Sequence, residues 1–129
     1  MPAPVIVVHP DLNTRDLALA ILRNAGLEAA GFEDPIVALD TVEADGRSRV
    51  LVTAVNFGSG KLNGAALVRM LKYKRGAIQA VFLAGPEHAE HVAGEGLILL
   101  EPADPLALLD GVARLLSETA RAKNTKQLA

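Results

Sequence analysis

The chain has 129 residues, half of them apolar, with a net charge of −2 and no cysteine, which is typical of one soluble globular domain. Its near-neutral charge and 3% aromatic content argue against a nucleic-acid partner, which would need clustered cations or stacking aromatics. The lack of cysteine excludes disulfides, thiolate metal sites and cysteine catalysis. No run of about 18 apolar residues could span a membrane, and no basic segment precedes the first apolar run as in a secretory signal. We therefore expect a cytoplasmic protein with no membrane partner.

Short apolar runs alternate with helical patterns along the whole chain. Buried strands are predicted at residues 5–8, 27–32, 50–55, 80–83 and 97–100. Helices are predicted at residues 12–25, 35–44, 65–74 and 87–93, and from residue 105 onward. Strict alternation with short connections predicts a single α/β domain, a three-layer doubly wound sandwich with a five-stranded parallel sheet between helices.

Three of the predicted helices begin at a capping signal. Asp11 or Asn13 can cap the first helix with a side-chain oxygen. Asp34-Pro35 and Asp104-Pro105 each place a cap before a proline, which is favoured at the first helical position because its missing N–H would have no partner there. These signals predict where the second and last helices begin.

The apolar faces of two helices and the end of the domain are also predicted. The second helix is expected to bury Ile36, Leu39 and Val42. The last helix is expected to bury one face, which consists of Leu106, Leu109, Val112, Leu115 and Leu116. Beyond Ser117 the chain is polar and basic, so the domain is predicted to span residues 1–122 and residues 123–129 to fray.

The stretch RVLVTAVNFGSGKLNG, residues 49–64, combines a buried strand, a glycine-containing loop and the start of a helix. In parallel α/β sheets, sites form in the loops at the carboxyl ends of the strands. The strand in this stretch stops at Asn56. Any site in the protein is therefore expected to include Asn56 or its neighbours.

Four segments, taken in order, resemble the receiver domain of two-component response regulators over residues 4–118. VIVVHPD at residues 5–11 is similar to the receiver strand that ends in acidic residues. Residues 56–64 have the receiver spacing from the phospho-acceptor to the glycine that opens the third helix. Phe82 to Gly85 and Leu99 to Pro102 are similar to the ends of the fourth and fifth strands. The resemblance implies a flavodoxin-like (βα)5 fold with strand order 2-1-3-4-5 and a cis bond before Pro102.

Receivers accept a phosphoryl group from a histidine kinase onto an aspartate, with the help of Mg²⁺. The resemblance places Asn56 at the acceptor position and His9 and Pro10 at the acidic pair, with Asp11 one place beyond the pair. The hydroxyl position holds Ala84. The remaining two positions, the lysine and the aromatic switch, hold Glu101 and Ile98. Every residue that would carry the chemistry is therefore replaced.

Elementary chemistry leads to the same conclusion about this pocket. Mg²⁺ prefers oxygen ligands with one or two carboxylates, and phosphoryl transfer depends on positioning and on stabilisation of charge. Asn56 is not a carboxylate nucleophile, and Glu101 would repel an incoming phosphate. We therefore expect weak or absent Mg²⁺ binding, no cofactor, no metal site, no catalytic residue and no enzyme activity. As a hypothesis, His9 and Glu101 form a charge-swapped pair that fills the pocket; the alternative is that both point to solvent.

Two other sequence patterns could indicate a ligand site, but both match their motifs only in part. Gly58-Ser59-Gly60-Lys61 looks like part of a phosphate loop, but the full pattern needs glycine at position 55 and Ser or Thr at position 62. His88 and His91 are three residues apart and could share a helix face, but they lack the His-Glu-x-x-His order of a zinc site. A flexible turn and two solvated histidines explain these segments.

The function predicted from the sequence is that of a stand-alone, degenerate receiver that binds a protein partner without being phosphorylated. The expected partner is a histidine kinase, another two-component protein or a second copy of the chain. The fourth helix, fifth strand and fifth helix are predicted to supply the interaction surface, with His88, His91, Ile98, Arg114 and Glu118.

Three alternatives stay open at this point. The first is a phosphorylatable receiver with an atypical acceptor such as Asp11. The second is a small-ligand sensor at the altered pocket around His9, Asn56 and Glu101. The third is a domain whose partner-binding surface lies elsewhere and whose old pocket is merely filled.

Overall fold

Five parallel strands form one sheet in the order β2-β1-β3-β4-β5, as predicted. The computed structural model describes residues 4–44, 46–58, 60–74 and 77–128, and the side chains as far as residue 119. The strands are β1 Val5–Val8, β2 Ala29–Phe32, β3 Val50–Ala54, β4 Gln79–Ala84 and β5 Leu97–Leu100. The helices are α1 Leu12–Asn24, α2 Pro35–Ala44, α3 Gly64–Lys74, α4 Pro86–Ala89 with the 3-10 turn Glu90–Val92, and α5 Pro105–Leu128.

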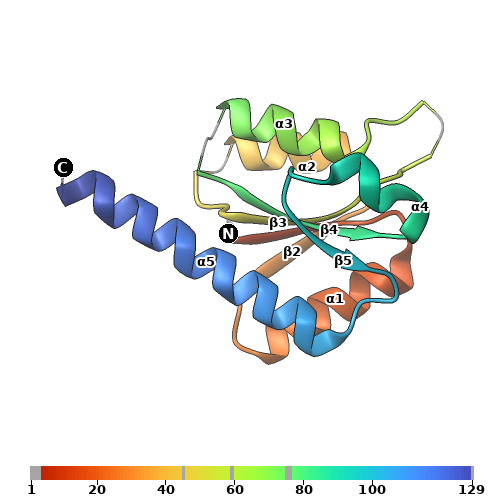
Figure 1. Ribbon diagram of the computed structural model, residues 1–129, viewed down its shortest axis with the longest axis horizontal. Coiled ribbons are helices and arrows are strands. Elements are labelled where there is room, and N and C mark those ends of the chain that lie inside the picture. Colours follow the sequence, from red (N-terminus) through yellow and green to blue (C-terminus); the bar gives the residue numbers. More distant parts are fainter. Residues whose placement is uncertain (1–3, 45, 59, 75–76, 129) are drawn as a thin grey trace.

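The helices cover both faces of the sheet, which gives three layers. Figure 1 shows α2 and α3 on one face and α1 and α5 on the other. Side chains of the central strands alternate between the two faces, because successive residues of a strand point in opposite directions. Ile6, Leu51 and Phe82 belong to the cluster under α2 and α3, whereas Val7 and Val52 belong to the cluster under α1 and α5. The core is thus two aliphatic layers that share one sheet.

The predicted buried faces of two helices are wrong at one residue each. Ile36 is 48% exposed and Leu106 is 75% exposed, whereas Ala38 and Leu108 are almost completely buried. The face that meets the sheet is set by how each helix crosses it, and a residue in the first turn can lie outside that face although its spacing fits a stripe. A small residue such as Ala38 then packs in the core between the helix and the sheet.

Helix α5 continues to Leu128 in the backbone, and fraying of the chain beyond residue 122 stays a prediction. Figure 1 shows the end of α5 extending past the edge of the sheet. Residues 117–128 contain neither glycine nor proline and are rich in Ala, Lys, Arg and Gln, which have high helix propensity. Composition therefore allows the helix to continue where the apolar pattern stops. Within the described part of the chain, no helix is both long and apolar enough to cross a membrane.

Candidate functional site

The predicted site residues gather at the carboxyl edge of the sheet. A hollow of about 180 Å³ is lined there by side chains at or just beyond the ends of β1, β3, β4 and β5, among them His9, Asn56, Ala84, His88 and Glu101. In the sheet, β3 and β4 separate β1 from β5. The loops after β1 and β5 therefore meet through long side chains that reach across the hollow.

His9 lines the hollow and is buried, with only 6% of the residue exposed. Its ring Nδ1 accepts a hydrogen bond from the backbone N–H of Asp11 at 3.0 Å, so this nitrogen carries no proton. The neutral ring then has its proton on Nε2, which lies 3.3 Å from Oε1 of Glu101 and donates to it. The backbone carbonyl of His9 accepts a hydrogen bond from Arg15 at 2.7 Å. The hypothesis that His9 and Glu101 meet is supported, and the contact is a hydrogen bond from a neutral imidazole.

Asp11 caps α1, as predicted. Its carboxylate accepts from both the hydroxyl of Thr14, at 2.6 Å, and the backbone N–H of Thr14, at 2.9 Å. The hydroxyl hydrogen bond and then the amide hydrogen bond hold the pKa of Asp11 below its ordinary value. The carboxylate is exposed and committed to the helix end, and it does not line the hollow.

The loop after β3 is shaped by Asn56 and by the close approach of Gly64 to the strand. The side-chain oxygen of Asn56 accepts from the N–H of Gly58 at 2.9 Å, which closes a turn. The N–H of Gly64 donates to the carbonyl of Val55 at 2.8 Å, and a Cβ on Gly64 would lie 2.0 Å from the carbonyl oxygen of Ala54. Only glycine fits there, so α3 begins directly against β3 and Asn56 stays at the rim of the hollow.

The glycine loop does not resemble a phosphate cradle in the part that is described. Gly58 and Gly60 have positive φ angles of 109° and 76°, as in a turn, and Ser59 lies outside the described residues. Lys61 approaches the carboxylate of Asp34 at 3.8 Å. The angles of Gly58 and Gly60 and the contact of Lys61 fit the interpretation of a turn.

The loop after β5 is tied to the end of β4. The N–H of Glu101 donates to the carbonyl of Ala84 at 2.9 Å, and the Glu101-Pro102 bond is cis, as predicted. Ala84 is 1% exposed and offers only a methyl group to the hollow. Pro10 and Pro102 lie on the surface. The side chain of Glu101 is 33% exposed and is the acidic group of the hollow nearest to His9.

The five residues of the predicted interaction surface do not behave alike. His91, Arg114 and Glu118 are exposed, whereas His88 is partly buried and Ile98 packs against the core. The rings of His88 and His91 are 6.2 Å apart, centre to centre. Among the described residues, no three His, Cys, Asp or Glu side chains converge as a metal site would require.

An ion pair that the sequence analysis did not predict joins α3 to the segment before β5. Arg69 donates to Oε1 of Glu95 through Nε at 3.0 Å and through Nη2 at 2.8 Å, and Lys72 donates to the backbone carbonyl of Glu95 at 3.1 Å. The hydrogen bond between them raises the pKa of Arg69 and lowers that of Glu95. No spacing in the sequence relates residues so far apart, so only the fold reveals this contact.

The fold of this chain is similar to that of several solved structures, although the sequence comparisons found no match. No protein-family model and no curated protein sequence matches the chain. Among solved structures, NtrX from Brucella abortus is similar with a TM-score of 0.87 and 22% identity, covering 100% of this chain and 30% of NtrX. The chain therefore spans less than a third of the length of that protein.

Two smaller solved structures are similar over nearly their whole length. A response regulator receiver protein from Pseudomonas putida has a TM-score of 0.75 and 24% identity, covering 88% of this chain and 98% of that one. A receiver domain from Clostridium thermocellum has a TM-score of 0.82 and 16% identity, covering 94% and 99%. The strand order and the layers described above are thus those of receivers: the chain has the fold of the response regulator receiver domain.

Proposed function

We propose that the protein is a receiver-like signalling module that binds a protein partner without being phosphorylated. The observation that carries the proposal is the contact between His9 and Glu101 across the hollow. Where the resemblance puts acidic metal ligands and a phosphate-binding lysine, the pocket has a neutral imidazole that donates to a carboxylate. An anion entering here would meet a carboxylate, and a cation would find few oxygen ligands.

The acceptor position supports the same proposal. Asn56 has a neutral amide whose oxygen is engaged with Gly58, so it offers no carboxylate to attack a phosphoryl donor. Asp11, the atypical acceptor that the sequence left open, is occupied at the helix end by both hydrogen bonds from Thr14. Phosphorylation at Asp11 would remove the cap of α1, which makes this alternative the weaker one.

The test is an amide NMR titration with Mg²⁺ and then with beryllofluoride, a mimic of the phosphoryl group. We expect no saturable shifts at Asn56, Ala84 or Glu101, while a phosphorylatable receiver treated in the same way responds. The variant Asn56→Asp restores a carboxylate but leaves His9 and Glu101 in place, and we expect it to stay silent as well. Saturable shifts in the native chain would refute the proposal.

The partner is proposed to be another protein of a two-component pathway, in line with the receivers that share the fold. The exposed residues Arg114 and Glu118 on α5 are the sites to change. Arg114→Glu should weaken binding of a purified partner at least about tenfold if the residue lies in the interface, since a charge reversal replaces attraction by repulsion. Arg23→Glu on α1 is a poor control because Arg23 binds the carbonyl of Ala29. Asp40→Lys serves instead, because Asp40 is exposed on α2, on the other face of the sheet from α5 (Figure 1).

A further inference from the structure

A second cavity lies between α1 and the segment that leads from β5 into α5. Its volume is about 350 Å³, within the range of small-molecule sites. It adjoins the hollow of His9 and shares Leu83 and Glu101 with it. The cavity is lined by Thr14, Leu17, Ala18, Ile21, Leu83, Glu101, Pro102, Ala103 and Leu108.

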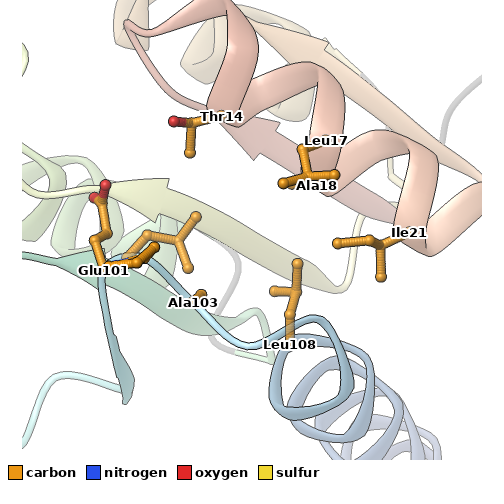
Figure 2. A pocket seen from close by; sticks show the side chains of 9 residues that line it. Thr14, Leu17, Ala18, Ile21, Glu101, Ala103 and Leu108 are labelled. Atoms are coloured by element: carbon orange, nitrogen blue, oxygen red, sulfur yellow. The ribbon is translucent and has the colours of Figure 1, made fainter.

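The cavity is apolar along most of its length. Ala18, Leu83 and Leu108 form a buried floor, each at most 3% exposed. Leu17 of α1 also lines the cavity, although 59% of it is exposed. Its apolar side chain therefore forms part of the wall at the surface of the protein. Figure 2 shows Leu17, Ala18 and Ile21 of α1 facing Leu108 of α5 across the cavity. Such walls suit an aliphatic or aromatic group.

The polar groups stand together at one end and are acceptors. Figure 2 shows the hydroxyl of Thr14 and the carboxylate of Glu101 at the same end of the cavity. The hydroxyl proton of Thr14 is already donated to Asp11, so its oxygen can only accept another hydrogen bond. The carboxylate of Glu101 accepts one hydrogen bond from His9 and retains further lone pairs. Arg15, the cation that follows Thr14 in α1, donates to the carbonyl of His9.

From this arrangement we propose that the cavity between α1 and α5 binds a small amphiphilic cation, an apolar group that carries an ammonium. The ammonium donates to the carboxylate of Glu101 and to the oxygen of Thr14, and the apolar part lies along Leu17, Ile21 and Leu108. A carboxylate or phosphate ligand would face the carboxylate of Glu101, and none of the side chains that line the cavity has a free donor for it, so the site discriminates by charge. Glu101 also accepts a hydrogen bond from His9. A ligand that binds Glu101 in this cavity therefore alters the contact between Glu101 and His9 in the neighbouring hollow.

Three probes with the same chain test the charge preference: n-hexylammonium, 1-hexanol and hexanoate, each titrated into the whole protein and followed by amide NMR. We expect saturable shifts at Thr14, Leu17 and Leu108 with hexylammonium. Its affinity should exceed that of hexanoate at least about tenfold, since a charge-assisted hydrogen bond is replaced by repulsion. Hexanol should lie between the two. Equal affinities for hexylammonium and hexanoate, or no saturable binding of hexylammonium, would overturn the proposal.

Variants separate the two ends of the cavity. Glu101→Gln keeps a side-chain oxygen for His9 but removes the charge, so hexylammonium should bind about tenfold more weakly while hexanol changes by less than about twofold. Ala103→Phe fills the cavity and should abolish binding of all three probes. Leu106→Ala, on the exposed side of α5, is the matched control and should bind as the native chain does.

Should Ala103→Phe fail to fold, Thr14→Val removes the second acceptor and should weaken the binding of hexylammonium selectively. Unchanged binding of hexylammonium in both Glu101→Gln and Thr14→Val would refute the proposed site. The beryllofluoride titration is independent of these measurements, so either proposal can fail alone.

Discussion

At the scale of single residues, two hydrogen bonds determine which ring nitrogen of the neutral His9 carries the proton. With Nδ1 accepting from Asp11 and Nε2 donating to Glu101, the ring is fully hydrogen-bonded in its neutral form. A second proton, on Nδ1, would point at the N–H of Asp11 and break that bond. The local geometry therefore favours a fixed tautomer in the pocket.

We expect the imidazole nitrogens of His9 to show this tautomer in solution. In ¹⁵N-labelled protein, the Nδ1 shift should be that of an unprotonated nitrogen and the Nε2 shift that of a protonated one. Glu101→Ala removes the acceptor and should lower the free energy of unfolding by about 1 kcal/mol, the usual net value of one hydrogen bond. Glu101→Gln is the control that retains an acceptor. A protonated Nδ1 in the neutral ring would contradict the assignment.

Asp11 gives a prediction about pH. Its pKa lies below the ordinary 3.8 because of the hydrogen bonds from Thr14, so folding favours the ionised form. The stabilisation is complete above the ordinary pKa and is lost as pH falls through the lowered one. Melting temperatures measured from about pH 6 to about pH 2 should show this acid-dependent loss, and Asp11→Asn should lack that part of it.

Two variants of Asp11 separate the helix cap from the negative charge. At pH 7, Asp11→Ala should lower the melting temperature, whereas Asp11→Asn should keep it close to that of the native chain because asparagine caps a helix equally well. Equal losses in both variants would mean that the charge, not the cap, is what matters.

At the scale of elements, the start of α3 depends on the absence of one side chain. A Cβ on Gly64 would lie 2.0 Å from a backbone oxygen of β3, which cannot move aside as a side chain can. Gly64→Ala should therefore lower the free energy of unfolding by at least about 2 kcal/mol, measured by urea denaturation. Gly111→Ala in α5 is the control, since the added Cβ would meet only the flexible end of Leu97 and an alanine favours the helix.

Two leucines in α5 test which face of that helix packs on the sheet. Leu108 is 2% exposed and Leu106 is 75% exposed, although both are leucines at the start of one helix. Leu108→Ala should cost about 2–5 kcal/mol of unfolding free energy, because it opens a cavity in the core. Leu106→Ala should stay within about 0.5 kcal/mol. Similar losses in both variants would contradict the orientation of α5.

At the scale of the whole molecule, the two apolar layers depend on the same strands. Alternate residues of β1, β3 and β4 belong to different clusters, so neither layer can lose its strands while the other keeps them. We expect urea unfolding followed by far-UV circular dichroism and by the methyl NMR signals of each layer to give coincident transitions. Phe82→Ala in one layer and Val112→Ala in the other should both move the single transition to lower urea.

The sequence alone determined most of the architecture. Buried runs of β-branched residues, capping aspartates and the alternation of strand and helix are local signals, and each predicted element is present in the described chain. The residue types at the positions that the resemblance marks, His9, Asn56, Ala84 and Glu101, are also known from the sequence, because the chemistry of a side chain can be named without the fold.

Tertiary structure decided the contacts between distant loops. Residues 9 and 101 lie at the ends of strands that are not neighbours, so only the folded sheet shows that the two side chains reach each other. The cavity between α1 and α5 and the pairing of Arg69 with Glu95 arise in the same way. The exposed positions of Ile36 and Leu106 have a related cause, because the rotation of a helix on a sheet is fixed by packing against partners that local periodicity does not specify.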